Sequence, residues 1–499
     1  MTSLSYDVIV VGGGNAALAA ALSAHEAGAR TAILEAAPKA YRGGNSRFAS
    51  AAFRIVHNGM EDIEPLIHPD WKYLAKRARL VPFTKERYAN EMLETSRGHC
   101  DKEAMHVMFD HSYDTVKWMR DQGVRWKLAL SKFFSEDQIT QDVVDINPGL
   151  CLIADNEGIG LTDNLWAAVE KSSIDAHYSS PAYDLITNGD NILGVRARQK
   201  DGFVDFKGQV ILACGGFEAS PRLRRQYLGQ GWDLAKVRGC RYNTGTMIEN
   251  AISHGAQATG HWGGCHAVPV DHNAPAVGDL RLTDKTSRYS YPFAIMVNKD
   301  GQRFVNEGEN TFELTYAAIG EQIAKQKEAV AFQIFDQKVL KTLEPRYSTA
   351  TPVVDDTLEG LAQKLGLNVK QFVDTVREFN AAVPKTGQFD PFHLDGLSTG
   401  TKLAIPKTNW AQAIDQGPFV AYAVTCGITF TYGGLKTDPY AHVLNNEGEK
   451  MPGLWAVGEI SGGFFAFNYP GAAGLVKGAV FGRLAGQAAA RRAKDQNRA

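Results

Sequence analysis

The chain has 499 residues, with 53 basic and 55 acidic side chains and a formal net charge of −2. Nucleic-acid-binding proteins normally carry a basic excess, so this balance argues against a nucleic-acid partner. Hydrophobic residues make up 44% and charged residues 22%, which is typical of a globular protein of roughly two to four domains.

Cysteine usage and the start of the chain indicate an intracellular protein. The six cysteines contain no C-x-x-C pair, as expected of reduced thiols in the cytosol. The chain enters an apolar segment by residue 6 without a basic region or a small-residue cleavage site, so we expect no signal peptide. No uninterrupted apolar run approaches membrane-spanning length. The sequence therefore predicts a cytoplasmic protein without a transmembrane segment.

The first 35 residues predict a β-α-β unit. Tyr6 to Val11 is a short apolar run that ends in Gly12-Gly-Gly14. Asn15 to Ala27 is typical of an alanine-rich helix that ends at Gly28, and Thr31 to Glu35 is the next strand. Such a unit is the usual entry to a doubly wound parallel sheet.

Further elements of the same domain are expected at both ends of the chain. Interleaved acidic and basic residues between 70 and 125 predict a helical insertion. The apolar runs Val210 to Phe217 and Gly453 to Glu459 each break at glycines, as buried parallel strands do at their carboxyl ends. A final helix is expected from Gly474 to Arg492 and would close this domain.

The middle of the chain differs from both ends in its amino-acid composition. Residues 240–415 are rich in prolines, aromatic residues and hairpin signals, and we interpret them as an inserted domain. Within them, Met296 to Glu307 predicts two strands around a tight turn at Lys299-Asp300-Gly301. Leu358 to Phe379 predicts an amphipathic helix.

Gly12-x-Gly14-x-x-Ala17, placed after a strand and opening a helix, is a dinucleotide fingerprint. The glycines let the backbone approach a pyrophosphate, and the helix N-terminus supplies N–H donors and the positive end of its dipole. Glu35, at the end of the second strand, can accept hydrogen bonds from ribose hydroxyls. A plain turn is the alternative, and the strand and helix around the glycines argue against it.

Motifs along the whole chain identify the dinucleotide. They are Gly43-Gly-Asn-Ser46, Asn243-Thr-Gly245, Met296-Val-Asn-x-x-Gly-x-Arg-Phe-Val-Asn-Glu307, Ala456-Val-Gly-Glu459 and Gly474-Leu-x-x-Gly-x-x-Phe-Gly-Arg483. In this combination the chain resembles the FAD-binding fumarate reductase and succinate dehydrogenase flavoprotein superfamily. The resemblance implies FAD as cofactor. No second fingerprint is visible for NAD(P)H beside it.

The resemblance also implies which residues contact FAD. No histidine lies in Asn45 to Ser50, where related enzymes form the covalent flavin link, so we expect noncovalent binding. The expected cofactor-binding residues are Gly12, Gly14, Asn15, Ala16, Glu35, Ala36, Gly44, Asn45, Ser46, Ala49, Ser50, Ala182, Ala213, Cys214, Gly215, Asn243, Gly458, Glu459, Gly474, Leu475 and Val476.

Three dicarboxylate ligands of that superfamily are missing. Fumarate reductases carry a proton-donating arginine four residues after the Asn-Glu pair, where this chain has Thr311. A second arginine is replaced by Asn468-Tyr469, and a family histidine by Phe430. These side chains cannot form the charge-assisted clamps that two carboxylates require. Fumarate or succinate is therefore a poor prediction for the substrate.

The motifs are most similar to the tricarballylate dehydrogenase branch, whose members oxidise a CH–CH bond beside a carboxylate. The similar segments are Cys265-His266, Asp271-x-Asn-Ala-Pro275, Tyr289-Ser-Tyr-Pro-Phe293, Thr425-Cys-Gly-Ile-Thr-Phe430 and Phe467-Asn-Tyr-Pro-Gly471. Asn310-Thr-Phe-Glu313 and Phe48 depart from the branch at expected pocket positions, with a loss of charge. We therefore expect a substrate with fewer carboxylates, or a ketone.

Tyr469-Pro-Gly471 also resembles a loop of 3-ketosteroid dehydrogenases, in which a tyrosine hydroxyl and a backbone N–H hold a ketone oxygen. Tyr469 is our candidate oxyanion donor, assisted by backbone near Gly474. A base must also take the α-proton. In falling order, the candidate proton-transfer groups are Tyr291, Arg288, Tyr289, Tyr316 and His266. Arg47, Arg54 and Lys477 could bind one substrate carboxylate.

Together these features predict a doubly wound α/β FAD-binding domain with an inserted α+β capping domain. The domain bounds are 1–239 and 416–499 for the FAD-binding domain and 240–415 for the cap. The predicted function is an FAD-dependent dehydrogenase acting on a CH–CH bond next to a carboxylate or ketone, with a separate electron acceptor such as oxygen, a quinone or a membrane partner. The alternatives are an ene-reductase fed by a separate donor and a flavin-binding protein without catalysis.

Overall fold

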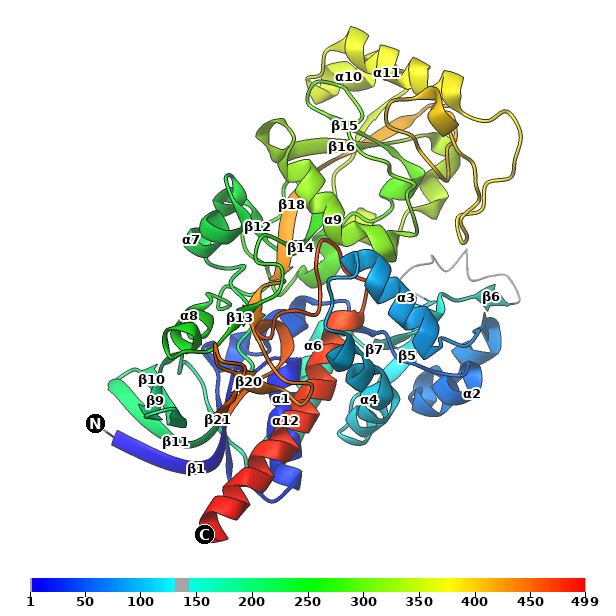
Figure 1. Cartoon of the computed structure of the whole chain (residues 1–499). Coiled ribbons are helices and arrows are strands. Elements are labelled where there is room, and N and C mark those ends of the chain that lie inside the picture. The colour runs from blue at the N-terminus through cyan, green and yellow to red at the C-terminus, as the bar shows by residue number, and fades with distance from the viewer. Residues whose placement is uncertain (1, 131–142, 499) are drawn as a thin grey trace.

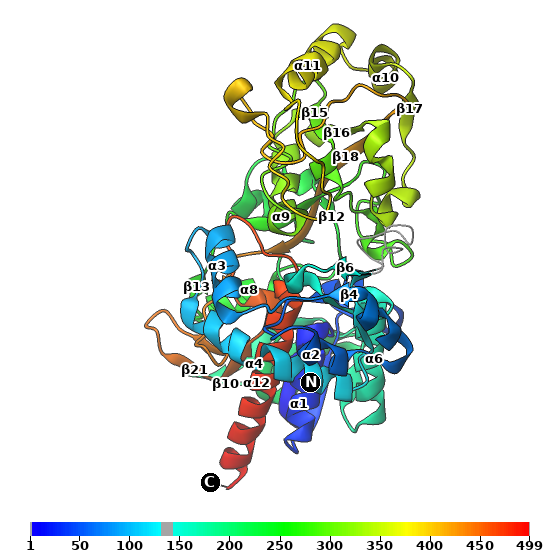
Figure 2. The same cartoon turned by 90° about the vertical axis from the view of Figure 1, so that its right-hand side faces the viewer.

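The computed structural model describes residues 2–130 and 143–498. The chain forms two stacked parts, an α/β part that contains both termini and a cap above it (Figure 1). The view turned by 90° shows the same two parts, with α1 and α12 in the lower one and α10 and α11 at the far end of the cap (Figure 2). Within the described residues, no helix is both long enough and apolar enough to span a bilayer.

The lower part is built on an eight-stranded sheet with a parallel core. The parallel strands follow the order β21, β11, β1, β2, β8, and β20 pairs antiparallel to β21 at one edge. An antiparallel pair, β9 and β10, extends β11. The strands are β1 (Thr2–Val11), β2 (Thr31–Leu34), β8 (Asp175–His177), β9 (Ala182–Asn188), β10 (Asn191–Gln199), β11 (Gly202–Leu212), β20 (His442–Leu444) and β21 (Lys450–Ala456).

Helices α1 (Asn15–Glu26) and α12 (Ala473–Arg498) lie side by side on this sheet, although they come from opposite ends of the sequence (Figure 1). Their close approach depends on glycines one helical turn apart. A Cβ added at Gly482 would lie 2.4 Å from the Ala16 carbonyl oxygen, and one added at Gly486 would lie 2.3 Å from that of Ala20. The two backbones therefore touch, and this contact joins the two ends of the chain into one domain.

A helical insertion covers one side of the lower part. Its helices are α2 (Met60–Ile63), α3 (Lys85–Ser96), α4 (Lys102–Asp121) and α6 (Glu157–Lys171), and the α7 (Pro221–Leu223) and α8 (Thr246–Ser253) helices follow β11. Short strands join these segments: β3 (Ala52–Phe53) and β5 (Trp126–Leu128) with β7 (Leu152–Ala154), β4 (Ala78–Arg79) with β6 (Val144–Asp145), and β13 (Ala258–Thr259) with β19 (Gly434–Leu435). These observations agree with the predicted insertion between residues 70 and 125.

The cap is built on a second, six-stranded sheet. Its longest strand, β18 (Phe419–Thr431), pairs with β12, β14, β16 and β17, and it runs down toward the lower part (Figure 1). The other strands and helices are β12 (Lys236–Val237), β14 (Cys265–Asp271), β15 (Ile295–Asn298), β16 (Val330–Phe335), β17 (Val353–Asp355), α9 (Phe312–Ala324), α10 (Leu358–Leu365) and α11 (Val369–Ala382). The cap sheet thus includes strands on both sides of the predicted 240–415 segment.

The α/β class with an inserted cap is as predicted, and two local elements differ. The amphipathic helix expected over 358–379 is two helices, because Gly366 adopts a φ of +68° and ends α10. The hairpin expected over 296–307 keeps its turn at Gly301, but its second arm contributes only the bridge between Val297 and Arg303. β15 pairs with β16 instead.

Candidate functional site

A large cavity lies between the lower part and the cap. It contains about 2010 Å³ not filled by protein atoms, including solvent at its mouth. Its wall includes every predicted cofactor-binding residue except Val476, which is buried in the hydrophobic core. It also includes four of the six predicted catalytic residues, Tyr289, Tyr316, His266 and Tyr469.

The glycine loop after β1 leaves room at the N-terminus of α1. Gly12 has a φ of +120°, and an added Cβ would lie 2.3 Å from the Ala213 carbonyl oxygen. At Gly13 an added Cβ would lie 2.1 Å from Oε2 of Glu35. No side chain fits between these strand ends, so the helix N-terminus with its N–H groups faces the cavity.

Glu35 ends the second strand as a buried carboxyl on the cavity wall, 5% exposed. Its Oε1 accepts a hydrogen bond of 2.8 Å from the Ala37 backbone N–H. Burial raises the pKa of this carboxyl to about 7, and backbone hydrogen bonds oppose the shift.

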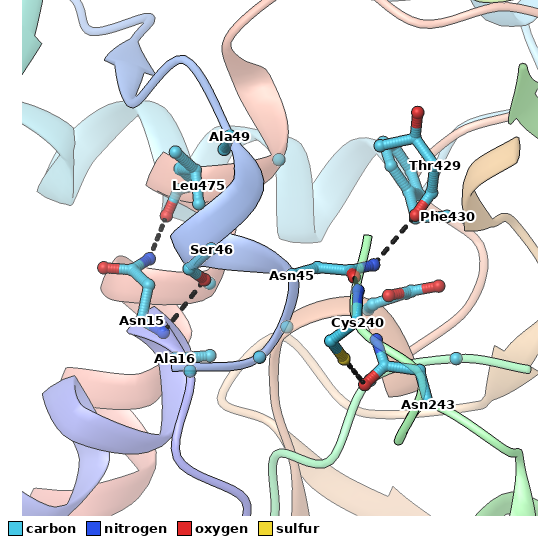
Figure 3. A pocket seen from close by; sticks show the side chains of 18 of the residues that line it. Asn15, Ala16, Asn45, Ser46, Ala49, Cys240, Asn243, Thr429, Phe430 and Leu475 are labelled. Atoms are coloured by element: carbon cyan, nitrogen blue, oxygen red, sulfur yellow. Dashed lines mark hydrogen bonds between the residues drawn. The ribbon is translucent and has the colours of Figure 1, made fainter. Parts of the chain in front are cut away.

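Asn15 connects three segments at this end of the cavity (Figure 3). Its backbone N–H donates to Oγ of Ser46 at 3.0 Å, and its amide Nδ2 donates to the Leu475 carbonyl at 2.8 Å. Its Oδ1 is buried and has no partner among the described residues. An unpaired buried acceptor on a cavity wall indicates a ligand or water that donates to it.

Asn45 joins the lower part to the cap. Its Nδ2 donates to the Thr429 carbonyl at 2.8 Å, and its Oδ1 accepts from the Cys240 backbone N–H at 2.8 Å (Figure 3). The same Nδ2 contacts Oε1 of the buried Glu218, which also accepts from Asn243 at 2.6 Å. The first loop after Glu35 is thereby fixed against the end of β18.

The buried Glu218 and the part-buried Glu459 lie beneath this contact. Oε1 of Glu459 accepts from the Thr431 backbone N–H at 2.8 Å. Burial raises the pKa of Glu459, and burial next to Glu459 raises the pKa of Glu218 well above its usual range. A Cβ added at Gly216 would lie 2.0 Å from Oε1 of Glu459, so a larger residue here would displace the Glu459 carboxyl.

These features fit FAD. The Gly12 loop and the start of α1 would hold the pyrophosphate, and Glu35 would hold the ribose hydroxyls. The unpartnered Asn15 Oδ1 and the polar groups around Asn45 and Glu459 offer hydrogen-bonding positions along the rest of the cavity.

At the cap side, Tyr469 lies in an aromatic cage. Its hydroxyl oxygen accepts a hydrogen bond of 2.9 Å from the Gly474 backbone N–H. Its ring contacts Phe465 and Phe430 edge-on, with centroids 4.9 and 5.1 Å apart. Burial raises the pKa of this hydroxyl to about 12, so Tyr469 is a neutral hydrogen-bond donor near pH 7.

His266 completes the cage from β14. Its ring centroid lies 4.9 Å from those of Tyr469, Tyr316 and Phe430. It is 2% exposed, and neither ring nitrogen has a partner among the described residues. Burial lowers the pKa of His266 well below its usual range, and the Arg238 charge lowers it further. The ring is therefore neutral near pH 7, with one N–H and one lone pair.

The structure places two predicted proton-transfer residues away from the described cavity wall. The Tyr291 hydroxyl shares a hydrogen bond of 2.5 Å with Oγ1 of Thr315, and Arg288 donates to Asp271 at 2.9 Å and to backbone carbonyls. Both are buried in the cap. We therefore do not propose either as a proton-transfer group.

Sequence reasoning missed four charged residues of the wall: Glu313, Arg238, Asp284 and Arg346. Glu313 accepts a hydrogen bond of 2.7 Å from the Thr311 hydroxyl, and burial raises the pKa of its carboxyl. The presence of Glu313 just after Thr311, where an arginine was expected, was the signal available for this residue. The other three carry no local pattern.

Comparison with known proteins gives the family. A family model described as "FAD binding domain" matches residues 7–476. The chain belongs to this family, and FAD is its cofactor. The family, the fold and the cofactor are thus as predicted.

Individual relatives are more distant. The chain is 26% identical over 498 residues to an NADH:fumarate oxidoreductase of Klebsiella pneumoniae (strain 342), covering 98% of this chain and 48% of the relative. It is 29% identical over 363 residues to a 4-oxocyclohexanecarboxylate 2-dehydrogenase of Sinomonas cyclohexanicum, covering 68% and 61%. The chain thus spans about half the length of the first relative. A 3-ketosteroid delta1-dehydrogenase from Sterolibacterium denitrificans has the same fold, with a TM-score of 0.73, 20% identity, and coverage of 98% of this chain and 100% of that one.

Proposed function

We propose that the protein is an FAD-dependent oxidoreductase that acts on a CH–CH bond next to a carbonyl, and that it works as a dehydrogenase of a ketone or a carboxylic acid. One observation carries the proposal: the Tyr469 hydroxyl accepts the Gly474 N–H at 2.9 Å, beside the neutral ring of His266, which has no hydrogen-bond partner among the described residues. This arrangement provides a donor for a carbonyl oxygen next to a lone pair that can accept a proton.

The cofactor would supply the acceptor for a hydride leaving the substrate β-carbon. The Tyr469 hydroxyl would donate to the carbonyl oxygen and stabilise the negative charge that develops when the α-proton leaves. Because its oxygen already accepts the Gly474 N–H, the O–H bond is polarised and donates more strongly. The Phe430 and Phe465 rings exclude water and strengthen this interaction.

We propose that a ring nitrogen of His266 accepts the α-proton of the substrate. A general base needs an unprotonated lone pair at working pH, and the neutral His266 ring has one. The Tyr316 hydroxyl is a poor base, because burial raises its pKa well above the usual range. Tyr316 packs edge-on against His266 at 4.9 Å and would fix the orientation of the ring.

The substrate class follows from the charges of the wall. Thr311 and Phe430 stand where fumarate reductases have charged ligands, so a clamp for two carboxylates is absent at those positions. The Sinomonas relative acts on a ring that carries one ketone and one carboxylate. A ketone or an acid with a single carboxylate is therefore our substrate class, rather than tricarballylate.

The reductase direction is the second candidate. The Klebsiella relative is an NADH:fumarate oxidoreductase, and the same donor and proton-transfer groups would serve addition across a C=C bond. In either direction we propose a separate electron carrier, since the sequence has only one dinucleotide fingerprint.

Exchange of the α-proton tests the proposal without turnover. The oxidised holoprotein would be incubated in D₂O with cyclohexanone, 4-oxocyclohexanecarboxylate or a 3-ketosteroid, and deuterium at the α-carbon measured by NMR. We expect exchange with at least one ketone, and its loss in Tyr469→Phe and His266→Gln. Tyr88→Phe is the control, because Tyr88 is also a buried tyrosine but lies outside the described cavity wall. Exchange that survives Tyr469→Phe would contradict the proposed oxyanion donor.

A further inference from the structure

Arg238 lines the cavity but takes no part in the proposed proton or hydride transfer. It follows β12, and its side chain is 9% exposed. Its Nε donates to Oγ of Ser287 at 2.9 Å, Nη1 donates to Oγ1 of Thr429 at 3.2 Å, and Nη2 bonds to Oδ1 of Asp284. Asp284 and Ser287 belong to one segment of the cap and Thr429 to β18, and together the three contacts fix the plane of the guanidinium group.

Arg238 and Arg346 share the Asp284 carboxylate. Asp284 binds Arg238 through Oδ1 and Arg346 through Oδ2, the latter at 2.8 Å. Arg346 has a second carboxylate, Glu344, at 2.5 Å, but Glu344 is not among the residues of the described wall. Two guanidinium groups and two carboxylates therefore form one cluster, in which Asp284 is the carboxylate that lines the described wall.

Arg238 also has donors to spare. A guanidinium group carries five N–H hydrogens. The contacts with Ser287, Thr429 and Asp284 use one hydrogen on each of the three nitrogens. The terminal nitrogens each keep a second N–H, and a pair of such hydrogens matches the two oxygens of a carboxylate.

A second residue of the same cavity carries an unsatisfied donor. Tyr289 lines the cavity, and its buried hydroxyl has no partner among the described residues. Its ring is held against Arg346, whose guanidinium carbon lies 4.4 Å from the ring centroid. Its backbone N–H donates to Glu344 at 2.7 Å. The side chain is thus fixed in place with an unsatisfied donor, which calls for an acceptor in the cavity.

We propose that Arg238 and Tyr289 bind one carboxylate group of the substrate, and that this enzyme acts on acids with a single carboxylate at that position. The inference rests on the proposed function, because it uses the same cavity. Arg346 and Asp284 are positioning residues: they hold the Tyr289 ring and the Arg238 fork without contacting the substrate.

The site lies next to the proposed chemistry. Thr429, which bonds to Arg238, precedes Phe430, whose ring stacks on His266 with centroids 4.9 Å apart and an interplanar angle of 15°. The Arg238 charge also acts on the His266 ring and on the Tyr469 hydroxyl. A carboxylate on Arg238 is therefore close to the carbonyl donor, and the substrate is a compact molecule.

Equilibrium binding tests this site without turnover. The holoprotein would be titrated with cyclohexanecarboxylate and with its uncharged analogue cyclohexanecarboxamide. Binding would be measured by calorimetry and by the change in the flavin absorbance. We expect the wild type to bind the carboxylate more tightly than the amide. Arg238→Gln should weaken carboxylate binding about ten- to a hundredfold and change amide binding little, since a charge-assisted contact is lost. Tyr289→Phe should weaken it by a smaller factor.

Two further variants keep the test decisive. Arg303→Gln is the matched control, because Arg303 is a cap arginine with a buried partner, Glu307, and lies outside the described wall. It should bind the carboxylate like the wild type. Arg238→Lys keeps the charge and should retain folding if Arg238→Gln does not, with binding weakened less.

Equal loss of carboxylate and amide binding in Arg238→Gln, or an unchanged preference for the carboxylate, would overturn the carboxylate site. These measurements need no turnover, so their outcome does not depend on whether the proposed dehydrogenase reaction is correct. Carboxylate binding through Arg238 with no α-proton exchange would leave the site in place and refute the dehydrogenase chemistry.

Discussion

The Tyr469 hydroxyl oxygen and the Gly474 backbone nitrogen are joined by a hydrogen bond of 2.9 Å at the cap side of the cavity. Replacement of Tyr469 by Phe removes the O–H donor and leaves the cage of rings. We predict a fall in kcat of about 10²- to 10³-fold, the cost of losing one oxyanion donor. FAD content and the thermal midpoint should change little. The same rate in Tyr469→Phe as in the Tyr88→Phe control would refute the assigned role.

His266 gives a prediction for stability against pH. Its folded-state pKa lies well below the ordinary value of 6.5, because burial disfavours the charged ring. Below pH 6.5 the unfolded chain takes up a proton that the folded chain resists, so stability falls by up to about 1.4 kcal/mol per pH unit. His266→Phe should reduce this acid loss, measured as melting temperatures between pH 7.5 and 5.5. His272→Phe, at an exposed position, should not, and equal acid sensitivity in both variants would contradict a buried neutral His266.

Glu35 predicts a pH dependence of FAD binding. Its pKa is raised from 4.5 to about 7 by burial, and ribose hydroxyls donate best to the ionised carboxylate. The dissociation constant for FAD should therefore rise about tenfold as pH falls from 8 to 6, and Glu35→Gln should remove this dependence. Fluorescence titration of the apoprotein measures it. The folding stability of the apoprotein has the opposite pH dependence. The folded chain holds the Glu35 proton more tightly than the unfolded chain, so the free energy of unfolding falls as pH rises from 4.5 toward 7. A flat FAD titration in the wild type would disprove the assignment.

Gly216 predicts a steric effect at the cofactor site. A Cβ there would lie 2.0 Å from Oε1 of Glu459, which is part-buried, and 2.3 Å from Oγ1 of the buried Thr431. Gly216→Ala should break their contact, lower FAD occupancy and cost more than about 2 kcal/mol of unfolding free energy. At Gly263 the nearest atoms are 3.8 Å away, so Gly263→Ala should stay within about 0.5 kcal/mol. Denaturant unfolding compares the two, and equal effects would show that the close approach is unimportant.

The cofactor end of the site could be predicted from the sequence because its signals are local. Gly12, the α1 helix and Glu35 follow one another within a single β-α-β unit, and a parallel sheet brings their ends together. The same reasoning placed the final helix, whose glycines pack on α1. Family motifs then identified the loops that reach the cavity from the cap.

The charged part of the wall could not be predicted in this way. Arg238 and Arg346 are 46 and 62 residues from the Asp284 that joins them, and no periodicity marks such pairs. Tyr289 and Tyr291 belong to one aromatic segment, and only the fold shows that the first lines the cavity and the second is buried beside Thr315. Long-range pairing of buried polar groups is decided by the assembled cap, not by local pattern.

An anaerobic absorbance titration of the yellow holoprotein is the most direct test of the proposed dehydrogenase reaction. The panel would contain monocarboxylic acids, a cyclic keto acid, a 3-ketosteroid, succinate and tricarballylate. We predict bleaching of the flavin band by a ketone or by an acid with a single carboxylate, and none by succinate or tricarballylate. A band unchanged by the whole panel, with the dithionite-reduced protein reoxidised by an unsaturated acid or enone, would contradict the dehydrogenase account and favour a reductase.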